Sequence, residues 1–419
     1  MTFAQALAAL EARRETRVEL GLDRVRAHLA RLGDPHERVP AFHVAGTNGK
    51  GSTCAMLAAV LRASGRRVGL YVSPHLADVR ERISVNGRMI SERAFARLIA
   101  RALAADQNSR LTYFELLTSA AFLHFADSGC GVAVLETGLG GRLDATNVVT
   151  RPLATVVTSV DYDHQEFLGR TLARIAAQKV GIFKAGRPAV FPDLPVLRHA
   201  RTRGDCVVVH RPWIAVRTDW ARGEQVLRSP QGREYPLALL GARQGWNAAL
   251  ARAAVEASGL SIPESAWRKG LAAVKWPGRF EVRSLGRKTL IVDGAHNPEA
   301  TRALAETWTA SAWFNRPSRW ILGLMRDKDL AGVLRPIAPF LRDVVVVRPP
   351  SPRALEPLEF AAAIRRAAPG AHVAVGRDPA HALAAWRRDA AAPAVAVCAG
   401  SLYLAGAALK AIAQSGRRA

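Results

Sequence analysis

The sequence lacks any long apolar run. No window approaches the roughly 18 consecutive uncharged apolar residues that a transmembrane helix needs, and residues 1–20 carry charges every few positions and no apolar signal-peptide core. Cysteine is also scarce. Cys54, Cys130, Cys206 and Cys398 are scattered, without the Cys-x-x-Cys pairing of zinc sites or a disulfide framework. We therefore expect a cytoplasmic protein that does not enter a membrane and carries out no redox chemistry.

Lysine and acidic residues are few relative to arginine. The 59 basic side chains include only eight lysines and face 35 acidic ones, which leaves a formal net charge of +24. Such an excess is typical of nucleic-acid binding, but the arginines are dispersed, and no basic run is interleaved with the aromatic residues of a single-strand groove. We expect no nucleic-acid partner. Attraction of anionic small substrates stays open as an alternative.

Apolar segments alternate with helical periods from about residue 40 onward. Buried parallel strands are predicted at 40–46, 67–72, 131–138 and 153–160, with crossover helices at 52–65 and 114–129. This alternation predicts a doubly wound α/β fold. Short turn-rich segments between about 205 and 240 predict a small antiparallel insertion, and two helices follow at 244–258 and 263–273.

A second β/α series begins after the turn at Pro277 and Gly278. Its predicted strands are 288–294, 319–324, 343–349, 371–376 and 394–402. We place the domain boundary after residue 282. The chain is then divided into a first domain, 1–282, which includes the antiparallel insertion, and a second α/β domain, 283–419, of ordinary size.

The stretch AGTNGKGST, residues 45–53, joins a predicted strand to a predicted helix. It misses the Gly-x-x-x-x-Gly-Lys-[Ser/Thr] spacing of common P-loops, because Val44 stands where the first glycine belongs and Gly51 follows Lys50. Backbone N–H groups of such a turn still point outward at a helix N-terminus, where the helix dipole favours an anion. We predict a phosphate cradle in which Lys50 reaches the outer phosphates. Lysine here is informative because arginine serves elsewhere as the generic cation.

The string AGTNGKGST resembles the ATP loop of the Mur ligase superfamily, and within it that of the folylpolyglutamate synthases and dihydrofolate synthases. Further matches follow in chain order: GLDRVRAHLARLG (21–33), SPHL (73–76), LTYFE (111–115), LETGLGGRLDATN (135–147), DYDHQEFLG (161–169), PGRFE (277–281), VDGAHNP (292–298), GLMRDKDL (323–330) and GSLYL (400–404). The resemblance therefore covers nearly the whole chain.

This resemblance implies a P-loop-type Mur ligase ATPase domain with a mostly parallel sheet, followed by a Rossmann-like α/β domain. It also implies an ATP- and Mg²⁺-dependent ligase. Such an enzyme phosphorylates the carboxylate of a folate, or of 7,8-dihydropteroate, and the amine of L-glutamate then attacks the acyl phosphate. We expect ATP as co-substrate, two Mg²⁺ ions, small-molecule substrates only, and a monomer.

The resemblance also assigns site residues in the first domain. ATP would be held by Gly46, Thr47, Asn48, Gly49, Lys50, Gly51, Ser52 and Thr53, and magnesium by Ser73, Glu136 and His164. The pteroate or folate would contact Leu111, Thr112, Tyr113, Phe114, Leu143, Asp144 and Ala145. Lys179 would be a catalytic group carbamylated by CO₂, a reaction that needs a neutral amine. Gln178 stands before it, where many members of the family have glutamate.

Four further segments carry the remaining assignments. Asn247 would contact the adenine nucleotide, although Arg243 replaces the histidine that usual members have four residues earlier. Arg279 and Asp293 complete the implied ATP contacts. His296 would be a catalytic and glutamate-binding residue, and Asp327 and Lys328 would shape the glutamate pocket.

Two alternatives remain at this point. A peptidoglycan-type Mur ligase would use the same activation chemistry, but the ATP loop begins after only about 40 residues, which leaves little room for a preceding UDP-binding domain. A basic P-loop nucleic-acid ATPase would need a Walker A motif and a focused basic groove, and the sequence contains neither.

Overall fold

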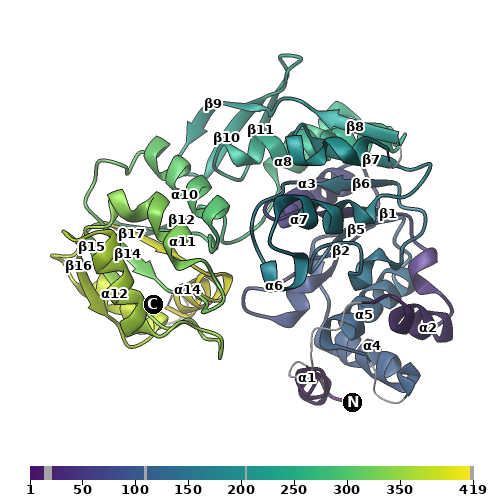
Figure 1. The fold of residues 1–419 in the computed structure, drawn as a ribbon, viewed down its shortest axis with the longest axis horizontal. Helices are drawn as coiled ribbons and strands as arrows, with labels where there is room; N and C mark the ends of the chain where they lie inside the picture. The colour runs from purple at the N-terminus through teal and green to yellow at the C-terminus, as the bar shows by residue number, and fades with distance from the viewer. Residues whose placement is uncertain (14–20, 108–110, 203–204, 416–419) are drawn as a thin grey trace. The chain divides into compact units, whose positions relative to one another are not determined.

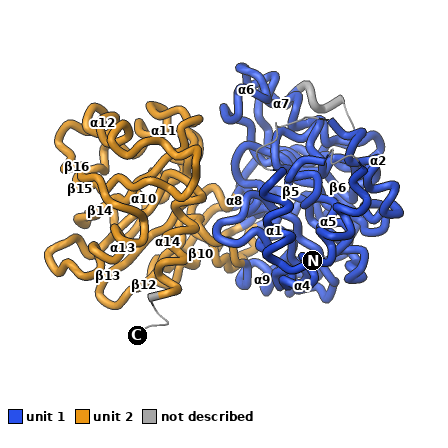
Figure 2. The backbone as a smooth tube through the Cα atoms, turned by 90° about the horizontal axis from the view of Figure 1, so that it is seen from below, with its two compact units in different colours: residues 1–213, 229–231, 246–274 blue, residues 214–228, 232–245, 275–419 orange. Residues whose placement is uncertain are grey.

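The chain is organised into two compact units, each assembled from separate stretches of sequence. The computed structural model describes residues 1–13, 21–107, 111–202 and 205–415. Unit 1 comprises residues 1–213, 229–231 and 246–274, and unit 2 comprises residues 214–228, 232–245 and 275–419 (Figure 2). The units differ from the predicted division: the chain enters unit 2 for the last time after residue 274 rather than 282.

Unit 1 contains an eight-stranded sheet with the order β4-β3-β2-β5-β1-β6-β7-β8 (Figure 1). The strands are β1 Ala41–Ala45, β2 Val68–Tyr71, β3 Ile83–Val85, β4 Arg88–Met89, β5 Val132–Glu136, β6 Ala154–Val157, β7 Pro188–Pro192 and β8 Asp205–Val209. From β2 to β8 all neighbours pair in parallel, while β3 and β4 form an antiparallel edge. β8 corrects one prediction, because residues 205–209 extend the parallel sheet instead of opening the antiparallel insertion.

The helices of unit 1 follow from their apolar spacing and caps. They are α1 Phe3–Glu11, α2 Asp23–Arg31, α3 Lys50–Ala63, α4 Glu92–Ala105, α5 Tyr113–Asp127, α6 Gln165–Leu168, α7 Leu172–Lys179, α9 Glu264–Ala272 and most of α8 Arg243–Ala257, with 3₁₀ turns η1 Pro35–Glu37, η2 Val79–Arg82, η4 Ala145–Val148, η5 Val180–Ile182 and η6 Pro195–Thr202. α4 shows the logic: Phe95, Leu98, Ile99 and Ala102 recur at helical spacing and are all buried. They join one core with residues of α1, α2 and α5.

The strand register brings four loops to one edge of the sheet of unit 1. Val44 pairs with Glu136 and Ala45 pairs with Val157, so the carboxyl ends of β5, β1 and β6 lie side by side. Tyr71 pairs with Leu135, which places the end of β2 next to them. In open α/β sheets this edge is where ligands bind.

Unit 2 contains a three-stranded antiparallel sheet and a six-stranded sheet. The first has the order β11-β10-β9, formed by β9 Ile214–Asp219, β10 Glu224–Arg228 and β11 Glu234–Leu237. The second has the order β12-β13-β17-β14-β15-β16, formed by β12 Glu281–Leu285, β13 Lys288–Val292, β14 Ser318–Leu322, β15 Asp343–Val346, β16 His372–Val375 and β17 Val395–Ala399. Only β12 is antiparallel to its neighbour. The antiparallel insertion predicted for the first domain therefore lies in unit 2 and begins at Ile214.

Helices follow the parallel strands of unit 2, as in a Rossmann-like fold. They are α10 Pro298–Ala310, α11 Leu330–Ile337, α12 Pro357–Ala367, α13 Pro379–Arg388 and α14 Leu402–Ser415, with the 3₁₀ turn η7 Ala338–Phe340. Trp308, Trp320 and Phe360 are among the largest side chains of its core. None of the helices in the described ranges of either unit is both long and apolar enough to cross a membrane.

Candidate active site

The predicted phosphate cradle connects β1 directly to α3. The helix begins at Lys50, two residues earlier than predicted, and the first helical hydrogen bond runs from Thr53 N to Gly49 O at 2.9 Å. The N–H groups of the first turn therefore have no partner within the helix and form an anion-binding end. Lys50 Nζ donates to the carbonyls of Gly46 and Thr47 at 2.9 and 3.0 Å. The ammonium thus lies over the loop it belongs to.

The segment after β6 braces this loop. Thr158 Oγ1 donates to Asn48 O at 2.6 Å, and Ser159 Oγ accepts from Asn48 N at 3.0 Å. Thr47 Oγ1 donates to Asp161 O and accepts from Asp161 N. Sequence reasoning missed Thr158, Ser159 and Asp161. The available signal was the polar string TSVD at the end of a strand adjacent to β1.

Two glycines of the loop are required by close approach. Gly46 has φ +153° and Gly49 has φ +85°, backbone conformations that favour glycine. A Cβ on Gly46 would overlap Thr158 Oγ1, and one on Gly49 would overlap Asn247 Oδ1. Thr53 Oγ1 also lies 3.4 Å from Asn247 Oδ1. The structure therefore brings Asn247, predicted as a nucleotide contact from a distant part of the chain, against the cradle.

Two of the three predicted magnesium ligands lie together. Ser73, which follows β2, donates its backbone N–H to Glu136 Oε2 at 3.1 Å, and Glu136 is buried at the end of β5. A buried carboxylate on the strand next to the one that leads into the cradle is the kind of oxygen ligand that a hard divalent cation takes. His164 lies at the start of α6 with its side chain 38% exposed and its backbone in the left-handed region. Its role as a third ligand stays a prediction.

Lys179 is the last residue of α7, and it is buried. The loop that follows β5 packs on this end of the helix. Arg142 N donates to Gln178 O at 2.7 Å, and Gly141 lies against the carbonyls of Gln178 and Lys179 so closely that a Cβ there would be 2.9 to 3.0 Å from them. The structure therefore places the buried Lys179 beside the loop that follows Glu136. Its carbamylation stays a prediction.

Asp144 organises the loop after Glu136. Its Oδ2 accepts from the backbone N–H groups of Gly138 and Leu139 at 2.9 and 2.8 Å, and its Oδ1 accepts from Thr146 N at 3.0 Å and from Thr146 Oγ1. Burial raises the pKa of this carboxyl, and the four hydrogen bonds act in the opposite direction. Both carboxylate oxygens are therefore engaged within the loop. The predicted pterin contacts of Leu143, which is 36% exposed, and of Asp144 and Ala145 stay predictions.

The hydrogen-bond chain continues into the sheet. His43 of β1 is fully buried, and its Nε2 lies 2.7 Å from Thr146 Oγ1. Because that hydroxyl donates to Asp144, the imidazole donates from Nε2. Burial lowers the pKa of His43 to about 3, so the ring is neutral at pH 7. β1 is thus linked to both the phosphate cradle and the loop after Glu136.

The predicted pteroate segment, residues 111–114, lies against the same loop. Thr112 caps α5 and forms a capping box with Glu115. The ring of Phe114 contacts Gly138 so closely that a Cβ there would lie 2.6 Å from the ring. The Tyr113 ring stands 5.6 Å from the guanidinium of the buried Arg82, whose Nε donates to His75 Nδ1 at 2.9 Å. Sequence reasoning missed Arg82, which follows the SPHL segment by six residues.

In unit 2, three predicted segments meet at the carboxyl edge of the six-stranded sheet. Val292 pairs with Cys398 and Leu322 pairs with Ala399, so the loops after β13, β17 and β14 are neighbours. Asp293 accepts from Phe280 N and Ala295 N, both at 2.7 Å, and burial raises its pKa while the charge of Arg279 lowers it. His296 Nδ1 lies 2.8 Å from Gly294 O.

The DKD segment follows β14 at this edge. Lys328 Nζ lies 3.5 Å from Asp327 Oδ2, and the Lys328 side chain is only 7% exposed. The third residue of the segment, Asp329, caps α11 by accepting from Gly332 N at 3.0 Å. β17 lies between β13 and β14, so the loops that carry His296 and Lys328 lie on either side of the loop after β17. That the two side chains share a glutamate pocket stays a prediction.

Comparison with known proteins decides the family. Residues 44–209 match the Mur ligase middle domain, and residues 278–402 match the Mur ligase glutamate ligase domain. The dihydrofolate synthase/folylpolyglutamate synthase of Escherichia coli is 38% identical over 339 residues, covering 79% of this chain and 78% of that protein. The chain belongs to the folylpolyglutamate synthase/dihydrofolate synthase family of Mur ligases. The predicted family is therefore confirmed.

Solved structures of the family share the fold. E. coli FolC in complex with DHPP and ADP has a TM-score of 0.88 at 33% identity, over 100% of this chain and 99% of that one. The bifunctional enzyme of Yersinia pestis complexed with AMPPNP and a Mn ion has a TM-score of 0.85 at 31% identity, over 99% and 98%. These matches confirm the two-domain α/β architecture predicted from the sequence.

Proposed function

We propose that this protein is an ATP- and Mg²⁺-dependent ligase that adds L-glutamate to folates and, as a second reaction, to 7,8-dihydropteroate. The observation that carries the proposal is the junction of β5, β1, β6 and β2, which puts a phosphate cradle with Lys50 beside the Ser73–Glu136 pair. Phosphoryl transfer depends mostly on positioning and on neutralising charge. This edge of the sheet supplies both.

The residues of unit 1 then take the following roles. The N–H groups at the start of α3 hold phosphate oxygens. Lys50 breaks its hydrogen bonds to the loop carbonyls and binds the transferred phosphoryl group instead. Ser73, Glu136 and His164 would hold magnesium, which neutralises charge on the phosphates when it is bound. Carbamylated Lys179 would add a second anionic group for the metals. Asn247 would position the nucleotide, and residues 111–114 with Leu143, Asp144 and Ala145 would hold the pterin.

The residues of unit 2 would serve the second substrate. His296, Asp327 and Lys328 would bind L-glutamate so that its amine can attack the acyl phosphate, and Arg279 and Asp293 would contact ATP. The buried Asp293 already fixes the backbone of residues 280 and 295. We propose that this carboxylate positions the VDGAHNP segment in addition to any nucleotide contact.

A coupled ATPase assay tests the function. ADP release should require L-glutamate together with either dihydropteroate or tetrahydrofolate, and Lys50→Ala should lower kcat by about 10²-fold or more, as loss of a charge-stabilising group typically does. Arg101→Met, which removes an exposed ion pair between α4 and α5, is the control. If neither pterin stimulates glutamate-dependent ADP release by the unaltered protein, the folate assignment is wrong.

Lys179 needs a separate experiment. Lys179→Ala should be nearly inactive and should regain activity with a short-chain carboxylate such as acetate, whereas the unaltered protein should lose activity when bicarbonate and CO₂ are removed. Full activity of Lys179→Ala would eliminate the carbamate role and leave the rest of the proposal intact.

The proposal also includes a monomer in the cytoplasm without a nucleic-acid partner. Light scattering and cell fractionation test the first two parts. ATPase activity that duplex or single-stranded DNA stimulates, and that falls with added salt, would instead favour the nucleic-acid ATPase alternative.

A further inference from the structure

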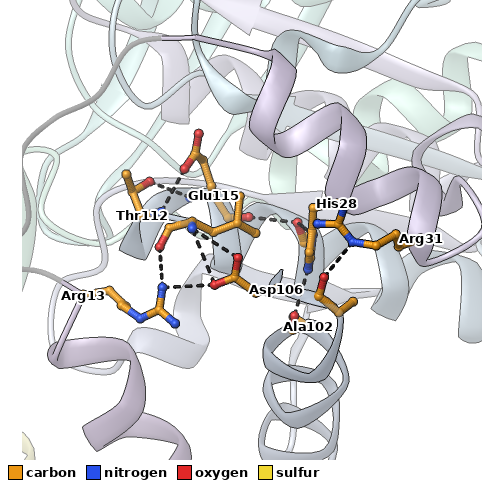
Figure 3. A network of polar contacts seen from close by, with 10 residues as sticks. Arg13, His28, Arg31, Ala102, Asp106, Thr112 and Glu115 are labelled. Atoms are coloured by element: carbon orange, nitrogen blue, oxygen red, sulfur yellow. Dashed lines mark hydrogen bonds and ion pairs between the residues drawn. The ribbon is translucent and has the colours of Figure 1, made fainter. Parts of the chain in front are cut away.

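The N-terminal helices of unit 1 carry polar side chains that are directed inward. On α2, Arg24, His28 and Arg31 recur at the i, i+4, i+7 spacing of one helix face, and each contacts α4 or α5. Figure 3 shows the contacts of His28 and Arg31 with the end of α4. Of the three, His28 is buried, Arg24 is partly exposed and Arg31 is exposed. A buried polar group is costly unless it is paired. The groups that these side chains contact therefore show which parts of α4 and α5 are held by α2.

Two of these contacts cap the end of α4. His28 Nε2 lies 2.8 Å from Ala102 O, and Arg31 Nε donates to Ala105 O at 2.8 Å. The last four carbonyls of a helix have no partner within the helix, so side chains from another helix complete them here. The other ring nitrogen of His28 lies 3.0 Å from Ser119 Oγ of α5.

A second pair of contacts holds the start of α5. Arg24 Nη2 donates to Glu115 Oε1 at 3.1 Å, while Glu115 Oε2 accepts from Thr112 N at 2.8 Å. The Glu115 side chain is only 4% exposed. One carboxylate thus joins α2 to the capping box of the pteroate segment.

A third set holds Leu111 by both of its backbone groups. Arg13 Nη1 donates to Leu111 O at 2.9 Å and to Asp106 Oδ2 at 3.0 Å, and the Asp106 carboxylate faces Leu111 N at 3.3 Å. The Asp106 side chain is 2% exposed. Figure 3 shows these contacts converging on the two helix ends that flank the pteroate segment.

We propose that Arg13, Arg24, Asp106 and Glu115 are positioning residues for pterin recognition. This inference rests on the proposed function, because it needs residues 111–114 to contact the pterin. The ion pairs fix Leu111 and Thr112, Thr112 begins α5, and Phe114 in the first turn of α5 packs on Gly138. We call Arg13, Arg24, Asp106 and Glu115 the clamp. The clamp therefore sets the spacing between the pterin-contacting rings and the loop that follows Glu136.

The clamp predicts a selective defect. Glu115→Gln keeps a side-chain oxygen for the capping box but removes the charge that Arg24 pairs with, and Arg24→Met removes the other partner. Both substitutions should raise KM for dihydropteroate by about tenfold, because a misplacement of about 1 Å can lower a reaction rate by up to about 10²-fold. KM for ATP should change by less than about twofold. Arg24→Lys should restore part of the pterin affinity, because it retains the charge but not the fork.

Arg101→Met is the matched control. The Arg101–Asp127 pair also joins α4 to α5, but its side chains are 44% and 30% exposed and it lies away from residues 106–115. This variant should leave both KM values unchanged. Hydrogen exchange should show faster exchange at the amides of residues 111–116 in Glu115→Gln, with α3 unaffected.

The outcomes separate the clamp from the function it rests on. If neither dihydropteroate nor tetrahydrofolate binds to the unaltered protein or stimulates its ADP release, the proposed function fails and the clamp proposal fails with it. If the unaltered protein binds the pterin but Glu115→Gln and Arg24→Met bind it equally well, only the clamp is refuted. An equal rise in KM for pterin and ATP, with a lower Tm, would show a structural role and also refute it.

Discussion

At the scale of single residues, buried polar groups hold the loops that carry the chemistry. The chain from His43 through Thr146 to Asp144 ties β1 to the loop after Glu136. Thr146 Oγ1 and both Asp144 oxygens are hydrogen-bonded, as is His43 Nε2, whereas the buried His43 Nδ1 has no hydrogen-bond partner among the described residues. None of the three needs to touch a substrate to influence catalysis.

The neutral, buried His43 predicts a pH dependence of stability. Its pKa in the folded state, about 3, lies below the ordinary value of 6.5, so the unfolded chain binds the extra proton first as the pH falls. Stability is therefore fully present above pH 6.5 and is lost as the pH drops towards 3. Between pH 7 and 5 the titration of this one ring should lower the free energy of unfolding by about 2 kcal/mol, at about 1.4 kcal/mol per pH unit below 6.5.

Urea unfolding of His43→Gln checks this expectation. Glutamine places an amide near the position of Nε2 and does not titrate, so the free energy of unfolding should fall by about 2 kcal/mol less than in the unaltered protein between pH 7 and 5. His124→Gln, which replaces a partly buried histidine of α5 whose pKa burial also lowers, should give a smaller difference. Equal pH slopes for His43→Gln and the unaltered protein would show that the ring is not buried neutral.

Gly138→Ala should impair the pterin reaction. The added Cβ would lie 2.6 Å from the Phe114 ring, so that the ring or the loop after Glu136 must shift. We expect kcat/KM for dihydropteroate to fall by about 10²-fold, the scale of a misplacement of about 1 Å. Steady-state kinetics measure it, with Gly131→Ala as control because its nearest neighbour atom lies 4.0 Å away. Unchanged kinetics would mean that Phe114 is free to move.

The sequence predicted those site residues that a strand end or a glycine turn displays. Lys50 and Glu136 follow directly from their positions after β1 and β5. Thr158, Ser159 and Arg82 could not be predicted in the same way, because their roles depend on which strands become neighbours, and β6 lies beside β1 although β2, β3, β4 and β5 come between them in the chain. Asp144 was predicted as a pterin contact, but its hydrogen bonds all lie inside its own loop.

At the scale of elements, α3 and α9 pack at unusually short range. A Cβ on Gly270 of α9 would lie 2.6 Å from Val60 Cα of α3. The helix that begins at the phosphate cradle is thus supported by a helix some 200 residues later, which no local pattern indicates. Strand and helix types were predicted well for the long apolar segments, whereas the short strands β3, β4 and β7 were not predicted, because a few residues carry little periodicity. The residues of β8 were expected to be strand-like but were assigned to the antiparallel insertion.

Gly270→Ala tests this packing. Alanine should favour an isolated helix by about 1 kcal/mol relative to glycine, but overpacking costs about 1–3 kcal/mol, and contact with backbone atoms leaves little room to adjust. We expect net destabilisation in urea unfolding. Gly370→Ala, where nothing lies within 4 Å of the added Cβ, should be close to neutral. Stabilisation by Gly270→Ala would show that the two helices can separate.

At the scale of the whole molecule, the charge of +24 predicts how substrates are attracted. A field of this sign raises the encounter rate with anions and is screened by salt. kcat/KM for a folate that already carries several glutamates should therefore fall more steeply between 20 and 200 mM salt than kcat/KM for dihydropteroate, which has one carboxylate. Parallel titrations with an uncharged osmolyte control for viscosity. Equal salt slopes would mean that the arginines act only as solvated surface.

The interleaving of the two units has a consequence for synthesis of the chain. Unit 1 needs α9, but residues 214–228 and 232–245 of unit 2 leave the ribosome before it does. Neither unit can be completed while the other is still entirely untranslated, so the nascent chain must carry the β9–β11 sheet without the six-stranded sheet of its unit until β12 and β13 follow. Since domains generally fold as units in order of translation, residues 214–245 are the stretch that a chaperone would meet exposed. A truncation after residue 282 would leave those same strands without the rest of their unit.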